Sequence, residues 1–566
     1  MTALLFLVAT IRDTFPDTWV ATDQLGRAVQ NPADPAPRPD KKVGVFYFIA
    51  NRVPGAPIYD NTVLLNQNPQ SPAYGPMMST HWWGRPWFGY YQSDDPFVIR
   101  KHMQMLADAG VDFIVFDNTN GPTYPDVYLN LCKVLEQMKA DGDPYPRIAF
   151  FTGHGAWNTL NRDFYSKNLY SDLWFRWLGK PLMMIHREGG DVIPPEIQST
   201  FTVRESWAWT PSAWFGDGKD KWPWLDNYPQ NFGWHNSKTV PEQVSVTVGQ
   251  HATSSIGRSS LAQHEPPLDD RRLSPQTPLG LCFNQQFQRA LQIDPQVLFI
   301  TGWNEWTATR FPQEGPGTFA GRPAKKGDGF FVDEFNEEFS RDIEPEDGRL
   351  QDNYYMQLCG LVRRYKGVRA VPPATHKSIR TEGGFDQWND VGPEYRDDVG
   401  DVVHRDWPGW ANLHYKDDSG RNDIVAAKVA SDDRSLYFYV RCHNAIVGRG
   451  QPDWMRLYLN VDGDAGTGWF GYDYAVNRIP GQATTSVERY VGKGPAWTSV
   501  GYATIRVEGN QMMLSVPRSL LAGHSHPPTI DFKWTDNIPE TNSVSAFTLY
   551  GDAAPNDRFS YRAKLR

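Results

Sequence analysis

The sequence predicts a (β/α)8 TIM-type barrel followed by an all-β sandwich domain. The 566 residues exceed what one ordinary hydrophobic core accommodates. Apolar strand-like runs alternate with helical patterns over the first two thirds, and the last third carries short β-branched and aromatic runs separated by turn residues. We therefore expect an N-terminal lead-in at 1–42, the barrel at 43–367, a linker at 368–384 and the sandwich at 385–566.

The first strand, helix and strand are the clearest part of the barrel pattern. The continuous apolar run 43–49 predicts a fully buried strand. Asp95 followed by Pro96 predicts a capped helix start, and Gly110 predicts the helix end. The run 111–116 follows at once as a second buried strand, which completes a right-handed βαβ unit.

The alternation continues along the chain without showing an eighth strand. The expected strands are 43–49, 111–116, 147–152, 181–185, 201–206, 244–248 and 297–301, with helices near 125–140, 160–178, 283–293 and ending near 367. A doubly wound open sheet would give the same alternation. No Gly-x-Gly-x-x-Gly follows the first strand, so the barrel is favoured.

The composition indicates a carbohydrate ligand. Aromatic residues make up 14% of the chain, with 22 Trp, and such rings stack on sugar faces. A net charge of −9 without basic clusters argues against nucleic acid. No run reaches the roughly 20 apolar residues of a membrane span. Residues 1–10 have the character of a short export signal, so we expect a secreted, periplasmic or cell-surface protein.

Polar residues that directly follow the expected strands are the candidates for an active site, because barrel enzymes place their sites at the C-terminal ends of strands. Cleavage of a glycosidic bond needs two carboxyl groups, and aromatic rings hold the sugar. The expected catalytic residues are Glu305, Asp117 and Glu205. The expected sugar-binding residues are Tyr47, Asn118, His154, Trp207, His251, Trp303, Asn304, Trp306 and Glu314.

Simpler roles exist for several of these residues. Asp117 could cap the loop that follows its strand. Glu205 could form an ion pair with its neighbour Arg204. The histidines could be structural, and His186 after the fourth strand belongs to the same set. An acidic residue between two tryptophans, as Glu305 is, would be costly to bury unpaired, which favours a cleft for it.

Tyr47, the passage 95–117 and Thr301-Gly-Trp-Asn-Glu-Trp306 together resemble the glycoside hydrolase family 71/99-like barrels, which include endo-α-mannosidases. The resemblance covers roughly 43–367. In family 99 the motif continues as Asn-Glu-Trp-His-Glu, with two functional glutamates. It implies that Glu305 is the base that assists attack by the sugar's own 2-hydroxyl. The second position is Ala308, so the acid must come from Asp117, Glu205 or, less favoured, Glu314.

Two further segments are rich in oxygen ligands. The turn with Asn460, Asp462 and Asp464 suits a structural Ca²⁺, and it resembles the calcium-bearing turn of carbohydrate-binding module family 9-like sandwiches. A plain Asp-Gly hairpin turn is the alternative. In the segment 331–345 a solvated charged loop is favoured over a sugar subsite.

These observations predict a glycoside hydrolase that cleaves O-glycosidic bonds in a complex polysaccharide or glycan and uses no cofactor in catalysis. One alternative is a non-catalytic carbohydrate-binding protein on a degenerate barrel, because Ala308 stands where an acid is expected. Another is a metal-dependent hydrolase that uses the histidines after the strands. The second is disfavoured because no His-Glu-x-x-His motif occurs.

Overall fold

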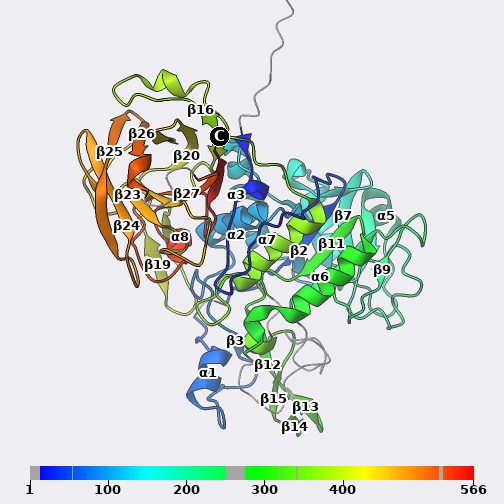
Figure 1. Ribbon diagram of the computed structural model, residues 1–566. Coiled ribbons are helices and arrows are strands. Elements are labelled where there is room, and N and C mark those ends of the chain that lie inside the picture. Colours follow the sequence, from blue (N-terminus) through cyan, green and yellow to red (C-terminus); the bar gives the residue numbers. More distant parts are fainter. Residues whose placement is uncertain are drawn as a thin grey trace, which may run out of the picture.

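The computed structural model describes residues 13–53, 55–249, 275–319, 322–339, 342–521 and 527–565. An antiparallel β domain and a parallel sheet lie side by side, and a smaller unit with α1, β3 and β12 to β15 projects below the parallel sheet (Figure 1). The export-signal prediction falls on residues 1–10, which lie outside the described residues. Among the described residues, no helix combines the length and apolar character that crossing a membrane requires.

All seven expected strands of the first region are confirmed. They are β2 (Lys42–Tyr47), β4 (Phe113–Asn118), β5 (Arg147–Thr152), β7 (Lys180–Ile185), β8 (Thr202–Glu205), β10 (Gln243–Thr247) and β11 (Val297–Thr301). They pair in parallel in the order β10-β11-β2-β4-β5-β7-β8. This is the neighbour order of a barrel whose sixth strand is missing.

The expected closed eight-stranded barrel is not found in the described residues. An irregular segment, 221–225, occupies the position of the sixth strand and bridges in parallel to Glu205 and Ala208. On the far side β9 (Phe232–Gly233) pairs antiparallel with β10. Pro223 in the middle of this segment has no backbone N–H to donate to a ladder, so the sheet is curled but its hydrogen-bonding ladder does not close among the described residues.

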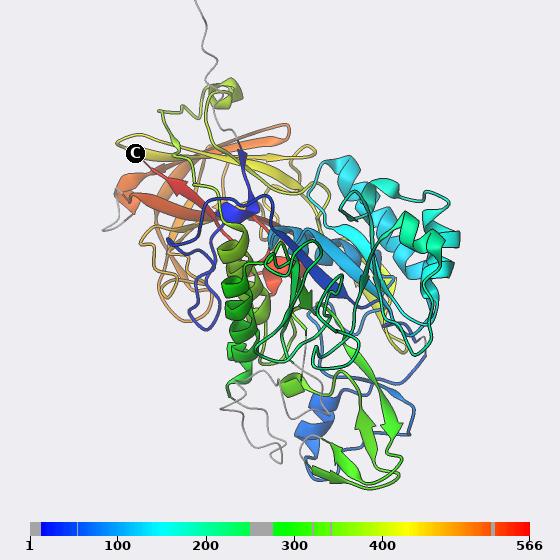
Figure 2. The ribbon, with the colours of Figure 1, turned by 90° about the vertical axis from the view of Figure 1, so that its right-hand side faces the viewer.

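The helices cover the outer face of the curled sheet. Helix α2 (Pro96–Asp108) begins as expected, since the Asp95 carboxylate accepts hydrogen bonds from the N–H groups of Phe97 and Val98. Figures 1 and 2 show α6 and α7 side by side. The main helices after α2 are α3 (Pro125–Asp141), α6 (Leu281–Ile293) and α7 (Asn353–Lys366).

The prediction of a helix at 160–178 is wrong. The stretch 160–178 forms α4 (Ala156–Leu160), a π-helical turn (Asn161–Tyr165), a 3-10 turn (Ser171–Leu173) and the short strand β6 (Arg176–Trp177). Asn168 and Tyr170 both adopt left-handed backbone conformations, with φ of 52°. A right-handed helix cannot continue through such residues.

The all-β character of the C-terminal region is confirmed. Its 13 strands form one hydrogen-bonded sheet with the path β1-β17-β20-β21-β26-β25-β24-β23-β22-β27-β28, to which β16 and β29 attach. The strands are β1 (Asp13–Thr14), β16 (Thr375–His376), β17 (Glu394–Arg396), β20 (Ile424–Ser431), β21 (Ser435–Cys442), β22 (Arg456–Asn460), β23 (Tyr474–Pro480), β24 (Thr484–Tyr490), β25 (Trp497–Glu508), β26 (Gln511–Pro517), β27 (Thr529–Asp536), β28 (Asp552–Ala554) and β29 (Tyr561–Lys564).

The N-terminal segment takes part in this β domain. Strand β1 pairs in parallel with β17, and Val20 bridges to Ser560 near the other end of the chain. The side chain of Trp19 packs on Phe559 and Tyr561, with ring centroids 5.7 and 5.8 Å apart. Residues 13–20 are therefore an integral part of the β domain's packing.

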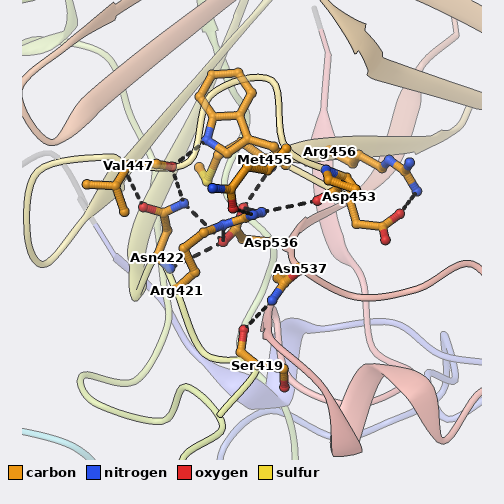
Figure 3. Close-up of polar contacts among 12 residues, drawn as sticks. Ser419, Arg421, Asn422, Val447, Asp453, Met455, Arg456, Asp536 and Asn537 are labelled. Atoms are coloured by element: carbon orange, nitrogen blue, oxygen red, sulfur yellow. Dashed lines mark hydrogen bonds and ion pairs between the residues drawn. The ribbon is translucent and has the colours of Figure 1, made fainter.

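The loops of the β domain meet at a buried carboxylate, Asp536 (Figure 3). Its oxygens accept two hydrogen bonds from the Arg421 guanidinium, at 2.9 and 2.8 Å. They also accept the backbone N–H and side-chain amide of Asn422 and the backbone N–H of Met455, at 3.0–3.2 Å. One side chain thereby joins the loop before β20 to the loop before β22.

The small projecting unit is built around a short antiparallel sheet. Strand β12 (Thr307–Pro312) pairs with β3 (Thr80–Trp82) and with β15 (Gly329–Phe331), and α1 (Asn61–Gln67) packs beside them. The hairpin of β13 (Gly317–Phe319) and β14 (Arg322–Ala324) completes this unit.

Four short elements lie outside the small unit. Strands β18 (Arg405–Pro408) and β19 (His414–Asp417) form a hairpin, α5 (Pro195–Thr200) contacts β8, and α8 (Ala546–Leu549) contacts β28.

Candidate active site

The inner face of the curled sheet leads to the candidate site. The cluster that fills it takes alternate residues of the strands, among them Phe46, Val115, Phe151, Met184 and Phe299. Successive side chains of a strand point to opposite faces. Asp117 and His186, two positions beyond Val115 and Met184, therefore fall on the inner side where strands β4 and β7 end.

Asp117 shapes the loop that follows β4. Its Oδ1 accepts hydrogen bonds from the backbone N–H and the hydroxyl of Thr119, at 3.0 and 2.7 Å. Burial and the nearby Asp117 charge raise the pKa of Tyr124. Asp117 is half-buried, so it performs the loop-capping role expected for it while remaining partly open to solvent. The neighbouring Asn118 is buried and donates to the Pro122 carbonyl at 3.0 Å.

Two histidines, a glutamate and a tryptophan meet beside this loop. The imidazole of His186 stacks on Trp207, with ring centroids 3.6 Å apart and planes inclined by 20°. Glu188 lies 3.7 Å from a ring nitrogen of His186 and 3.7 Å from one of His154. Burial lowers the pKa of His186, and the charge of Glu188 opposes that effect. His154 is largely exposed at the edge of the group.

Glu205 lies between two cations. Its Oε2 accepts hydrogen bonds from Arg187 and Lys221. The expected partner, Arg204, is instead buried and forms a bidentate pair with Glu242, at 2.8 and 2.6 Å. Both cations contact the same carboxylate oxygen, so Glu205 is suited to binding and charge stabilisation.

The backbone around Glu305 is held firmly after β11. The Glu305 N–H donates to Asp342 at 2.6 Å, and its carbonyl accepts from the Trp83 indole at 3.1 Å. The Asn304 side chain forms two hydrogen bonds with the backbone of Phe48, at 2.9 and 3.1 Å. Glu305 itself is 7% exposed. This loop is therefore a rigid platform for the glutamate.

Tyr47, Trp303 and Trp306 are buried beneath this loop, with at most 2% exposure. The Tyr47 hydroxyl lies 2.9 Å from Nδ1 of His102, whose Nε2 is 3.0 Å from Glu344. Glu344 also accepts hydrogen bonds from Trp306 and, at 2.8 Å, from Tyr91. A sugar cannot reach rings in these positions, so the three residues support the Glu305 loop from below.

Sequence reasoning missed this buried network and misjudged the acidic segment that supplies it. The expected solvated loop is wrong, because Glu334, Asp342 and Glu344 are at most 3% exposed. Asp342 and Glu344 are buried because the Glu305 N–H, two indoles and a tyrosine need acceptors. An acidic residue is usually buried only when it is paired in this way.

The remaining expected residues lie elsewhere. Ala308 belongs to an apolar cluster of the small unit with Phe331 and Phe335, so the position of the family's second glutamate is unsuited to a carboxylate here. Glu314 is exposed on the connection from β12 to β13 of the same unit. His251 lies outside the described residues.

The expected calcium turn satisfies its own backbone. Asn460 accepts from the N–H of Gly463, Asp462 from that of Asp464, and Asp464 from that of Gly466, each at 2.8 Å. These bonds are those of a tight turn in which Asx side chains cap the backbone. Calcium binding by this turn stays a prediction.

Comparisons with known proteins give no family and no curated relative: no family model matches the chain, and no curated protein does. Among solved structures, a GH99 endo-α-mannosidase from Bacteroides thetaiotaomicron is similar at 16% identity and a TM-score of 0.32, over 57% of this chain and 97% of that one. A glycoside hydrolase-like protein is 12% identical, with a TM-score of 0.33, over 60% and 98%. A carbohydrate-binding module of family 9 from Caldicellulosiruptor kristjanssonii, solved with glucose, is 14% identical, with a TM-score of 0.19, over 34% and 95%. None of these likenesses is strong enough to assign a function.

Proposed function

We propose that this protein is a glycoside hydrolase that cleaves O-glycosidic bonds of a complex polysaccharide or glycan at the C-terminal ends of its parallel strands. The observation that carries the proposal is that Asp117, the stacked His186 and Trp207, and the ion-paired Glu205 all lie at or just beyond the C-terminal ends of neighbouring parallel strands. Carboxyl groups beside an aromatic ring are the equipment that glycoside cleavage needs. We place the protein's action outside the cytoplasm, at the cell surface, in the periplasm or in the medium.

The carboxyl groups take different roles in this proposal. Glu305 is the base or nucleophile, and its backbone is fixed by Asp342 and Trp83. Asp117 is the acid, because Glu205 is committed to two cations. Glu205 and Trp207 contribute to sugar binding. No cofactor is needed for this chemistry, and the Asn460 to Asp464 turn is proposed as a structural calcium site only.

The test is cleavage of a broad panel of polysaccharides, followed as released reducing ends. Glu305→Gln and Asp117→Asn should each lower the rate at least 100-fold, since general acid and base groups contribute about 10²–10⁴-fold. Glu382→Gln, an exposed glutamate outside the site, is the matched control. All variants should melt within about 2 °C of wild type. Full activity of Glu305→Gln would refute the assignment.

A carbohydrate-binding protein without catalysis is the second candidate. The apolar surroundings of Ala308 and the two cations on Glu205 favour it, because both remove a proton donor from an expected place. The same panel distinguishes the two: retention of a glycan on the immobilised protein without any released reducing ends would support binding alone. Activity that EDTA removes and zinc restores would instead support the metal-dependent alternative.

A further inference from the structure

Three aspartates from distant parts of the chain meet where the β domain contacts helix α2. Asp397, Asp401 and Asp552 each place one carboxylate oxygen within 4.8 Å of those of the other two. Asp397 and Asp401 lie in the loop after β17, and Asp552 is the first residue of β28. The group therefore brings together segments about 150 residues apart in the sequence, and none of its members belongs to the candidate active site.

The carboxylates are buried and largely without hydrogen-bond donors. Asp401 is 1% exposed and Asp552 is 3% exposed. Both oxygens of Asp397, both of Asp401 and Oδ1 of Asp552 are buried and accept no hydrogen bond. The other oxygen of Asp552 accepts the Ile424 N–H at 2.6 Å. Buried carboxylates cost several kcal/mol each unless a positive group or donors compensate them.

The surrounding positive charges, those of Lys101 and Lys533, supply only part of that compensation. Lys101 of α2 is 3.8 Å from Asp401, at the outer limit of an ion pair. Arg100 is committed to Asp143, at 2.8 Å, and the ammonium group of Lys533 donates to the Pro555 carbonyl. Asp423 adds a further carboxylate, whose Oδ1 is also buried without a donor.

Burial and mutual repulsion both disfavour the ionised form of these carboxyl groups. Burial, followed by the charges of Asp401 and Asp552, raises the pKa of Asp397 well above its usual range. Burial and the charges of Asp401 and Asp423 do the same to Asp552. A bound cation would relieve this repulsion, and protonation of one or two of the carboxyls is the other way to do so.

The loop that carries two of these residues is already fixed. The Asp397 N–H donates to Val425 at 3.2 Å, and the Gly400 N–H donates to Asp423 at 2.9 Å. From the other side, the Val399 N–H donates to Asp143 at 2.9 Å. Contacts from both the β domain and the helical layer hold the loop, so the three carboxylates are pre-positioned.

We propose that Asp397, Asp401 and Asp552 bind a divalent cation, with Ca²⁺ as the fitting ion. An all-oxygen, carboxylate-rich set selects hard cations. Ca²⁺ tolerates irregular geometry, whereas Mg²⁺ demands a near-ideal octahedron and keeps its waters. The ion ties the loop after β17 to β28 and balances the charge that faces Lys101, so it clamps the β domain against α2. The site is separate from the Asn460 to Asp464 turn and does not depend on the proposed glycosidase activity.

The experiment compares the full-length chain after chelation and dialysis, with and without Ca²⁺, by calorimetric titration and thermal unfolding. The variants are Asp401→Asn and Asp552→Asn, and the matched control is the double variant Asp462→Asn, Asp464→Asn. Wild type should bind Ca²⁺ and melt at a higher temperature with it than with equal Mg²⁺. Each single variant should bind one Ca²⁺ ion fewer than wild type and should show a smaller Ca²⁺-induced rise in melting temperature. The control should keep the Ca²⁺ ion bound by the three aspartates and the rise in melting temperature that this ion causes.

The variants also separate a metal site from a folding defect. Without Ca²⁺, Asp401→Asn should melt at or above the wild-type temperature, because one repelling charge is gone. If it does not fold, Asp397→Asn takes its place, and anomalous scattering from Ca²⁺-grown crystals of the wild-type chain should show the ion between the three side chains. Two results would overturn the proposal. One is a Ca²⁺-induced rise in melting temperature that is lost only in the control. The other is a wild-type chain that does not respond to Ca²⁺ and whose melting temperature rises as pH falls from 7 to 5.

Discussion

Asp536→Ala gives the sharpest test of how the β domain is held together. The substitution removes the acceptor of five hydrogen bonds and leaves the Arg421 guanidinium, whose side chain is 12% exposed, without its carboxylate partner (Figure 3). Breaking a buried ion pair from one side costs about 3–5 kcal/mol. For a domain of roughly 150–250 residues, 1 kcal/mol corresponds to about 2–4 °C, so the β domain should melt about 6–20 °C lower.

Differential scanning calorimetry of the full chain measures this directly, because it separates the transition of the β domain from any other. Asp536→Asn should lose nearly as much, since an amide presents one acceptor oxygen in place of two and adds two donors. The control is Asp433→Asn, whose side chain is 97% exposed. If Asp536→Ala melted within about 1 °C of Asp433→Asn, the stabilising role of the Asp536 carboxylate would be refuted.

Three further predictions concern the parallel sheet and the small unit. Trp207→Ala should weaken glycan retention about 10-fold without lowering the melting temperature by more than about 2 °C, and unchanged retention would argue against stacking on this ring. Burial lowers the pKa of His81 to about 4. The stability that the neutral imidazole provides is present above pH 6.5 and is lost as pH falls towards 4, by roughly 3 kcal/mol, so His81→Gln should show a flatter pH profile of unfolding free energy. A Cβ at Gly153 would lie 2.1 Å from the Thr119 carbonyl oxygen, so Gly153→Ala should lower both stability and activity, and a wild-type melting temperature would contradict that.

The sequence predicts the strands of the parallel sheet well and its closure poorly. Five of the seven strands contain a continuous apolar run, which is the pattern of a strand buried on both faces, whereas β8 and β10 alternate apolar and polar residues. The apolar run in the segment 221–225 is short and is interrupted by Pro223, yet Trp222 and Trp224 pack into the interior cluster. The Trp-Pro-Trp sequence is the only local indication of this packing. It is found both in exposed loops and in segments that pack into a core, so it does not predict which of the two forms here.

The candidate site is predictable only in part, for a similar reason. The position of Asp117 and His186 follows from strand alternation, which is local. The network around Glu344 depends on His102 and Tyr91, which are more than 200 residues away in the sequence. The residues next to Glu344 in the sequence do not indicate these partners. The sequence of the Asp397 to Asp401 loop is likewise typical of a solvated acidic turn. Only the structure shows that Asp552 lies beside it.

The participation of β1 in the sheet of the β domain changes how the chain should be divided. Because β1 pairs with β17 and Val20 bridges to Ser560, the parallel sheet and its helices are an insertion between two pieces of one β domain. A fragment cut at residue 385 would expose the β17 edge and the surface that Trp19 covers. Expression trials of the β domain alone should therefore retain residues 13–22, supplied by a short linker or as a separate peptide.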